Sequence, residues 1–328
     1  MRAAFYDRLG PAREVLECGE MPTPEAGAGE VRVKIRASGV NPSDVKRRRG
    51  GRYGMDYPRV IPNSDAAGTV DQIGAGVSAH WLGRRVWLYN GQRGGRAFGT
   101  ACEHIALDAE LVNDLPERAS FAEGACLGIP GMTAHRVVFA DGPVAGKTVL
   151  VTGGAGAVGH FAVQLAKWGG AHVIATVSGD TKAAHARLAG ADVIINYRRE
   201  NVAEQVRAAT GGGGVDRIVE VDFGGNLETI VAVLKNNGSI ASYASEGNET
   251  PTLPFYAMMA KNHLIRLVTL NNMPIEARQA AQRDLNRWLE AAANPIIAVA
   301  GRFPLERIAE AHETVEKGAK LGTVIVEP

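Results

Sequence analysis

Short apolar runs alternate with amphipathic segments throughout the second half of the chain. The apolar runs have the length and the β-branched residues typical of buried strands, and they occupy residues 148–153, 172–177, 192–197, 216–221 and 239–244. The segments between them have helical spacing, and we expect helices at residues 160–169, 182–190 and 227–238, and a helix that runs into a glycine turn at residues 202–214. Strict alternation of strand and helix predicts an α/β fold with a doubly wound parallel sheet and helices on both faces.

The first part of the chain has a different pattern, in which short alternating segments are separated by glycine, proline and asparagine. In residues 30–40 the apolar positions Val31, Val33 and Ile35 alternate with charged ones, which is the period of a half-buried strand. Residues 66–74 and 83–90 are predicted as further strands. This pattern indicates a β-rich domain with many turns, such as a distorted barrel.

The change of pattern divides the chain into two domains. A helical stretch at residues 121–139, interrupted by Pro130, marks the change, and a long polar helix at residues 279–293 lies near the C-terminus. We predict an α/β domain at residues 126–264 and a β-rich domain that combines residues 1–125 and 265–328. The length of 328 residues fits this division, since a domain has typically about 150 residues.

Composition excludes several classes of protein. Hydrophobic residues make up 45% of the chain and charged residues 22%, which excludes a disordered or fibrous protein. The net charge of +1 gives no overall field that would attract nucleic acid or an anionic membrane. The N-terminus shows no secretory signal, and the uncharged stretch at residues 148–166 divides into strand, turn and helix. We therefore expect a cytoplasmic protein without membrane spans.

A glycine turn is the strongest single motif. Gly154, Gly156 and Gly159 form a GxGxxG pattern directly after a predicted strand and at the start of a helix. Such glycines permit a tight turn, approach of the backbone to a pyrophosphate, and close packing of helix on strand. The amides and the dipole of the helix N-terminus then attract phosphate. The pattern also fits a plain tight turn, but the surrounding βαβ units favour a Rossmann-type dinucleotide site.

The end of the second strand indicates which dinucleotide is bound. An NAD site usually has an acidic residue there for the ribose 2′-hydroxyl, whereas this chain has Ser178, followed by Lys182. With Tyr197 from the next strand, these side chains form a set that suits a 2′-phosphate. Asp180 would repel a phosphate unless it points into solvent. We therefore predict NADPH as the cofactor. The alternative is that Lys182 is only an exposed lysine in the first turn of a helix.

Other kinds of catalytic centre find no support in the sequence. The 8 histidines show no HxxxH or HExxH spacing, and Cys18, Cys102 and Cys126 form no CxxC pair. The chain has no GxSxG motif for a nucleophilic serine. These residues therefore favour hydride chemistry by a bound cofactor.

Several motifs spread along the chain resemble one family. They are the glycine turn and residues Ser38–Asp44, Ile61–Gly68, Leu127–Ala134 and Glu310–Glu313. Together they resemble the zinc-independent quinone oxidoreductases, the zeta-crystallin branch of the medium-chain dehydrogenase/reductase superfamily. The resemblance implies a GroES-like first domain, NADPH, a quinone or activated enone as substrate, and a homodimer or tetramer.

The resemblance also bears on whether the protein binds a catalytic zinc ion. Zinc-dependent members of the superfamily have a cysteine ligand after the Gly-Val pair and a His-Glu pair in the later glycine segment. At those places this chain has Asn41 and Asn63-Ser64-Asp65, which implies no zinc. Without a metal to polarise an alcohol, an electron-poor quinone or enone is the easier hydride acceptor.

Matching positions imply the site residues. Asn41 would lie beside the nicotinamide, and Tyr53 could take the place of a family tyrosine that Lys46 replaces here. The other implied cofactor contacts are Thr133 at the ribose, Ala155, Gly156, Ala157 and Val158 at the pyrophosphate, Ser178, Lys182 and Tyr197 at the 2′-phosphate, Asn226, Tyr243, Ala244 and Ser245 along the cofactor, and Val268 and Leu270 at the carboxamide.

Two alternatives depend on the basic run at residues 46–52. In an enoyl-thioester reductase the run would contact coenzyme A phosphates, and in a zeta-crystallin-like RNA-binding or structural protein it would contact nucleic acid. A solvated loop is the simpler interpretation of this run. Family members often have glycine at Asn63, which is a further departure.

Overall fold

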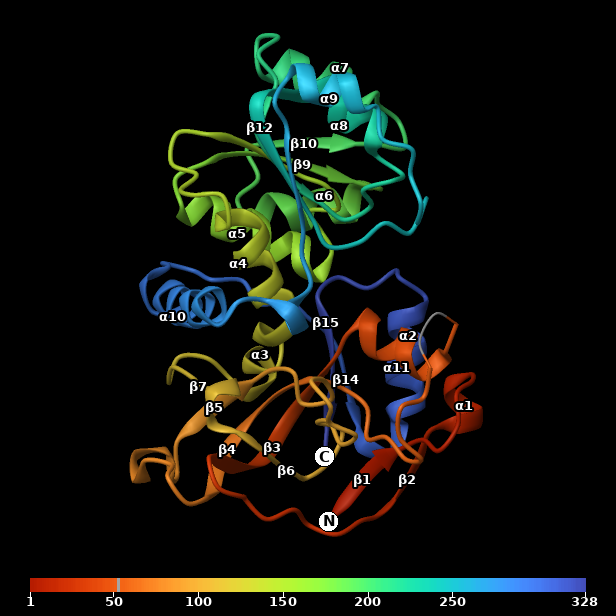
Figure 1. Cartoon of the computed structure of the whole chain (residues 1–328), viewed down its shortest axis with the longest axis vertical. Coiled ribbons are helices and arrows are strands. Elements are labelled where there is room, and N and C mark those ends of the chain that lie inside the picture. The colour runs from red at the N-terminus through yellow and green to blue at the C-terminus, as the bar shows by residue number, and fades with distance from the viewer. Residues whose placement is uncertain (52–53) are drawn as a thin grey trace. The chain divides into compact units, whose positions relative to one another are not determined.

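The computed structural model describes residues 1–51 and 54–328 (Figure 1). The chain forms two compact units, of which the first contains Met1–Ile129 and Ile297–Pro328 and the second contains Pro130–Ile296. This division differs from the predicted one, because residues 265–296 belong to the second unit. A strand in this segment pairs with the sheet of that unit, and its long helix packs on another helix there.

The second unit contains a six-stranded sheet in which each strand pairs parallel to its neighbours. The strands follow the order β10-β9-β8-β11-β12-β13. Their bounds are β8 Thr148–Val151, β9 His172–Val177, β10 Val193–Asn196, β11 Val215–Glu220, β12 Leu234–Ser242 and β13 Leu264–Leu267. This is the Rossmann order, in which the direction of winding reverses between β8 and β11. The predicted doubly wound sheet is confirmed.

Helices connect these strands, and the predicted positions hold with one exception. They are α4 Met132–Phe139, α5 Ala157–Trp168, α6 Asp180–Leu188, α7 Val202–Ala209, α8 Leu227–Val233, α9 Phe255–Ala260 and α10 Ile275–Ala291, with a 3₁₀ turn at Leu270–Asn272. The exception is α8, which was expected to run to residue 238 but ends at Val233. Asn237 adopts a φ of 59°, a left-handed conformation that interrupts a helix, and the segment joins β12 instead.

The first unit is the predicted β-rich domain. Its seven-stranded sheet has the order β14-β15-β3-β4-β5-β7, and β6 pairs with β3. The strands are β3 Glu30–Val40, β4 Asp65–Ile73, β5 Arg85–Leu88, β6 His104–Asp108, β7 Val112–Asp114, β14 Val299–Pro304 and β15 Thr323–Glu327, while β1 Arg2–Phe5 and β2 Glu17–Glu20 form a separate pair. Val31, Val33 and Ile35 of β3 are buried, as their alternation predicted.

Short helices cover parts of this unit. They are α1 Ala12–Val15, α2 Pro42–Arg49, α3 Phe121–Gly124, α11 Ile308–Glu316, a π-helical turn at Leu127–Gly131, and 3₁₀ turns at Ala79–Trp81, Ala109–Leu111 and Leu305–Arg307. In the part of the chain that the structure describes, no helix combines the length and the apolar character that crossing a bilayer requires.

Two histidines stack between neighbouring helices of the second unit. The rings of His160 on α5 and His185 on α6 are 3.9 Å apart and 10° from parallel. Burial, and then repulsion by the nearby His185, lowers the pKa of His160 to about 3. His160 is therefore packed in its neutral form.

Because His160 is packed in its neutral form, the free energy of unfolding decreases as the pH falls. Between the ordinary histidine pKa of 6.5 and the folded-state pKa of about 3, the unfolded chain binds a proton that the folded chain does not bind. The contribution of His160 is fully present above pH 6.5 and is lost as the pH falls through this window. Lowering the pH to about 5 costs about 2 kcal/mol at this site, at about 1.4 kcal/mol per pH unit.

We expect His160→Leu to reduce the loss of thermal stability between about pH 7.5 and about pH 5. The leucine keeps an apolar side chain in the site and cannot take up a proton. The unfolding midpoint should therefore fall less with acid than in wild type, by a few degrees. His80→Leu, at an exposed histidine, is the control and should follow wild type. Equal acid sensitivity in all three proteins would refute the role of His160.

Candidate functional site

The glycine turn joins β8 to α5 and packs too closely for side chains at two positions. A Cβ added to Gly159 would lie 2.2 Å from the Gly153 carbonyl oxygen, and one added to Gly154 would lie 2.8 Å from the Ala175 Cβ of β9. Gly153 has a φ of 65° and makes the tight turn itself. At Gly156 the nearest atom would be 3.3 Å away, and this residue is exposed. The turn therefore leaves room for a ligand at Gly156.

The start of α5 offers backbone donors at the same place. The first helical hydrogen bond is donated by the His160 N–H to the Gly156 carbonyl, at 2.8 Å. The amides of Ala157, Val158 and Gly159 precede it and have no acceptor within the helix. Together with the dipole of a helix of 12 residues, they attract an anion. The cradle fits the pyrophosphate of a dinucleotide.

A buried carboxylate supports the turn from the neighbouring strand. Glu220 ends β11, and its Oε1 accepts hydrogen bonds from the Thr152 hydroxyl at 2.9 Å, the Asp222 N–H at 2.6 Å and the Asn226 Nδ2 at 2.8 Å. Burial raises the pKa of Glu220. Sequence reasoning missed this residue, although an acid at the carboxyl end of an apolar strand was a visible signal. Glu220 thus connects β8, β11 and α8 at the switch point, the place between β8 and β11 where the direction of winding reverses.

The residues predicted to line the cofactor gather at the carboxyl ends of adjacent strands. Asn226 precedes α8 and Tyr243 follows β12. The Phe223 N–H donates to the Ala244 carbonyl at 3.0 Å, and the Ser245 hydroxyl accepts from the Gly224 N–H at 2.9 Å. The loops after β11 and β12 are thus tied together on the side of the sheet where the glycine turn lies.

The remaining predicted contacts of this unit lie on its other elements. The Val268 N–H donates to the Ser242 carbonyl at 2.8 Å and so extends the pairing of β13 with β12. Leu270 begins a 3₁₀ turn just beyond and is buried. Thr133 is buried in the first turn of α4.

The ends of β9 and β10 bring the predicted 2′-phosphate residues together. The Tyr197 N–H donates to the Val177 carbonyl at 3.1 Å, so Tyr197 and Ser178 follow adjacent strand ends. Lys182 is half-buried in the first turn of α6. Asp180 is exposed, as the NADPH interpretation requires.

A further arginine lies at this place. Arg199 Nη1 is 3.3 Å from Asp180 Oδ1, and both side chains are mostly exposed. Arg199 therefore supplies a cation beside the carboxylate that would repel a phosphate. Sequence reasoning missed this residue, although the Tyr-Arg-Arg run directly after β10 was a usable signal.

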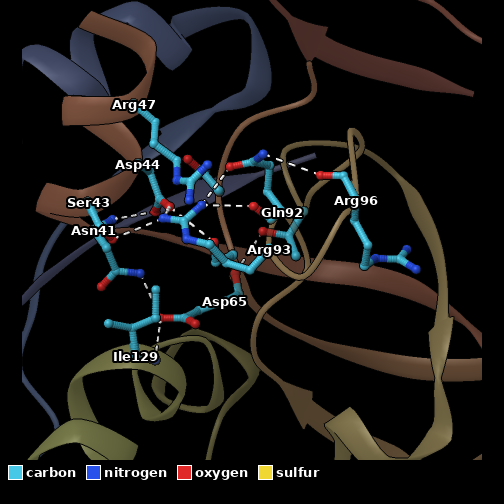
Figure 2. A network of polar contacts seen from close by, with 12 residues as sticks. Asn41, Ser43, Asp44, Arg47, Asp65, Gln92, Arg93, Arg96 and Ile129 are labelled. Carbon is cyan, nitrogen blue, oxygen red and sulfur yellow. Dashed lines mark hydrogen bonds and ion pairs between the residues drawn. The ribbon is translucent and has the colours of Figure 1, made fainter. Parts of the chain in front are cut away.

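In the first unit, Asn41 belongs to a buried polar network (Figure 2). Its backbone N–H donates to Asp44 Oδ2 at 2.9 Å, and its Nδ2 donates to Asp65 Oδ2 at 2.7 Å. Asp44 also accepts from Arg93 Nη2 at 2.8 Å and from the Ser64 hydroxyl at 3.1 Å. Asn41 is thus fixed at the start of α2 by two carboxylates.

Comparison with known proteins gives the family. Residues 27–144 match the "Alcohol dehydrogenase GroES-like domain" and residues 157–287 match the "Zinc-binding dehydrogenase" family. The human protein "Quinone oxidoreductase" is 31% identical over 322 residues, which cover 97% of this chain and 95% of the human one. The chain belongs to the quinone oxidoreductase family of medium-chain dehydrogenases/reductases. The predicted family, with its GroES-like and Rossmann-type domains, is confirmed.

The names of two other similar proteins mention a cofactor and a class of substrate. The Arabidopsis thaliana "NADPH-dependent alkenal/one oxidoreductase, chloroplastic" is 29% identical, across 100% of this chain and 80% of that protein. The structure of Escherichia coli quinone oxidoreductase complexed with NADPH has a TM-score of 0.87 and 25% identity, and each chain is covered completely.

Hydrogen bonds occupy the positions that hold zinc ligands in other members of the superfamily. Asn63 has a φ of 70°, a left-handed conformation that glycine adopts most readily. Its Nδ2 donates to the Ser38 hydroxyl at 3.0 Å, and its Oδ1 lies 3.1 Å from His312 Nε2. Among the described residues, no group of three or more His, Cys, Asp or Glu side chains could hold a metal ion.

The basic run of this family member is not a solvated loop. Its first part forms α2, in which Arg48 is fully buried, contacts the Gly10 carbonyl and forms an ion pair with Glu316 of α11. Arg47 lies 4.0 Å from Asp56. Among the described residues of the run, Arg48 is therefore removed from the surface and Arg47 is near a counter-charge, while Arg49 is exposed. Tyr53, the second predicted catalytic residue, lies outside the described residues.

The two central glycines should respond differently to a methyl group. Gly159→Ala places a Cβ against the Gly153 carbonyl, so we expect a lower unfolding midpoint and weaker NADPH binding. Gly156→Ala requires the Gly153 carbonyl to move by only a few tenths of an ångström, so its midpoint should stay close to that of wild type while NADPH affinity falls about tenfold, or about 1.4 kcal/mol. Thermal unfolding and fluorescence titration measure both quantities. Unchanged NADPH affinity in Gly156→Ala would contradict the pyrophosphate site.

Proposed function

We propose that the protein is an NADPH-dependent, zinc-independent oxidoreductase that transfers hydride to a quinone or an activated α,β-unsaturated carbonyl. The observation that carries the proposal is the glycine turn at the switch point, where three helix amides precede the first helical hydrogen bond. The names of the human and Arabidopsis relatives support the substrate class.

The chain offers contacts for each part of the cofactor. Residues 155–158 would hold the pyrophosphate, and Ser178, Lys182, Tyr197 and Arg199 would hold the 2′-phosphate. Asn41 and Thr133 would lie beside the nicotinamide, with Asn226, Tyr243, Ala244 and Ser245 along the cofactor and Val268 and Leu270 at the carboxamide. When bound, NADPH supplies the hydride. The role of the protein is to position the acceptor and exclude water.

The side chains at the zinc-ligand positions do not fit zinc. The Asn41 amide directs an N–H toward Asp65, and the Ser64 hydroxyl donates to Asp44. Zinc in proteins is bound by thiolate, imidazole and carboxylate, and the one carboxylate of this set already accepts two hydrogen bonds at its Oδ2. Polarisation of the substrate oxygen would therefore come from hydrogen-bond donors.

The two alternatives lose part of the charge on which they depended. Both a coenzyme A site and an RNA-binding surface needed the basic run to face solvent. Burial of Arg48 takes one cation from the surface, and Asp56 lies 4.0 Å from a second, Arg47. No observation in the structure favours either function over reduction of a quinone or enone.

A direct assay tests the proposed activity. NADPH consumption should be measured with a series of quinones, simple enones and enoyl-CoA esters. We expect turnover with quinones or enones and faster turnover with NADPH than with NADH. Turnover restricted to enoyl-CoA esters, or none with any quinone or enone, would refute the proposed function.

Lys182→Ala and Arg199→Ala should weaken NADPH binding more than NADH binding. Each removes a cation from the proposed 2′-phosphate contacts, and we expect a loss of about tenfold for NADPH, or about 1.4 kcal/mol. Arg187→Ala, in the last turn of the same helix as Lys182, is the control and should leave both affinities unchanged. Equal losses for the two cofactors would exclude the 2′-phosphate role.

We also propose that the protein is a homodimer that pairs through the edge of its Rossmann-type sheet. β13 is the last strand in the sheet order, and Leu267 on it is 75% exposed. On α9, Phe255, Tyr256 and Met259 are also exposed. An open edge strand with apolar side chains is a typical surface for strand pairing between copies.

Leu267→Asp combined with Tyr256→Asp should convert the dimer to a monomer. Two charges buried at the interface would cost more free energy than the apolar contacts between the two copies contribute. Size-exclusion chromatography with light scattering measures the mass, and Leu188→Asp is the control at an equally exposed leucine of α6. A monomeric wild type, or a variant that stays dimeric, would refute this interface.

A further inference from the structure

Two carboxylates in the first unit lie near a single arginine, which contacts only one of them (Figure 2). Asp44 and Asp65 are both buried, and so is Arg93. Arg93 Nη2 lies 2.8 Å from Asp44 Oδ1, and its Nη1 donates to Gln92 Oε1 at 2.6 Å. The guanidinium is thus directed at Asp44 and Gln92. Asp44 has a counter-charge, whereas Asp65 has none in direct contact.

The surroundings of Asp65 favour its neutral form. Its Oδ2 accepts from Asn41 Nδ2 at 2.7 Å and from the Ile129 N–H at 2.8 Å. Its Oδ1 is buried and has no hydrogen-bond partner among the residues described. A Cβ on Gly128 would lie 2.1 Å from Oδ1, so the π-helical turn encloses this oxygen. A charged oxygen without a donor is costly in such a place.

The charged and titratable groups around Asp65 come from three elements. Asp44 belongs to α2, Arg93 follows β5, and the Cys126 thiol precedes the π-helical turn. Burial, and then repulsion by Asp44, raises the pKa of Asp65 to about 8, despite the opposing hydrogen bond from Asn41. Asp65 is therefore protonated at neutral pH and loses its proton in mildly alkaline solution.

We propose that Asp65 is a positioning residue whose proton decides which edge of the Asn41 amide faces the nicotinamide pocket. This inference rests on the proposed function, which places Asn41 beside the nicotinamide. Charged Asp65 can only accept, so Asn41 must direct its Nδ2 toward it and present its Oδ1, an acceptor, on the other edge.

Protonated Asp65 permits the opposite arrangement. Its hydroxyl donates to Asn41 Oδ1 once the amide turns over, while the same oxygen still accepts from the Ile129 N–H. Asn41 then presents its NH₂ group to the substrate. Because negative charge builds on the oxygen of a quinone or enone as hydride adds, an N–H donor stabilises the transition state and an amide oxygen opposes it. The protonated state is the productive one.

The consequence is an alkaline limit to turnover that originates in Asp65. In wild type, kcat should fall about tenfold per pH unit above about pH 8, while NADPH affinity stays constant. Asp65→Asn keeps an oxygen that accepts from both the Ile129 N–H and Asn41 Nδ2, so it fixes Asn41 in the arrangement of charged Asp65 without a group that titrates. We expect a neutral-pH kcat about tenfold below that of wild type and no alkaline limit, and a kcat equal to that of wild type would also overturn the proposal. An unchanged alkaline limit in Asp65→Asn would overturn the proposal.

A second measurement does not depend on activity or on the variant. The side-chain NH₂ resonances of Asn41, observed by NMR in ¹⁵N-labelled wild type, should shift with a midpoint near pH 8. Asn41→Ala identifies these resonances by their loss. Resonances that stay constant through this range would overturn the proposal even if Asp65→Asn fails to fold. A clear titration without turnover of any quinone or enone would support the coupling of Asp65 to Asn41 and refute the proposed function instead.

Discussion

The close approach of α5 to the end of β8 is the constraint on which the nucleotide site depends. The turn leaves no space for a side chain at Gly159, whose Cβ would lie 2.2 Å from the Gly153 carbonyl oxygen. This packing directs the first amides of α5 into the open space at Gly156. Glu220 holds Thr152, directly before the turn, and Asn226, directly before α8. One tight turn and one buried carboxylate thus organise the carboxyl edge of the sheet.

In the first unit, the residues at the superfamily's zinc-ligand positions belong to a network of hydrogen bonds. Asn41 joins Asp44 to Asp65, Arg93 and Ser64 also donate to Asp44, and all of these residues are buried. A cluster with two carboxylates and one guanidinium cannot be fully charged at low cost, because an unpaired buried charge is strongly destabilising. The cluster therefore holds one proton, and in our account the position of that proton governs Asn41.

Local patterns in the sequence predicted much of the fold and of the nucleotide site. The alternation in β3, the apolar runs of the parallel sheet and the glycine turn are all encoded within short segments. Burial of Arg48 in the basic run could not be predicted from a short segment, because it depends on Gly10 and on Glu316, which lie 38 and 268 positions away. The same holds for residues 265–296, whose place in the second unit follows from the pairing of β13 with β12. The pKa of Asp65 likewise depends on groups from separate segments.

Deuterium transfer from NADPH labelled at C4 of the nicotinamide tests the central claim most directly. With an α,β-unsaturated ketone as acceptor, the account predicts a product with one deuterium at its β-carbon, detected by mass spectrometry, from only one of the two C4 positions of the cofactor. Such a result would establish both the cofactor and the direct transfer of hydride. Absence of turnover with every quinone and enone, or a reduced ketone without deuterium from either position, would contradict the account.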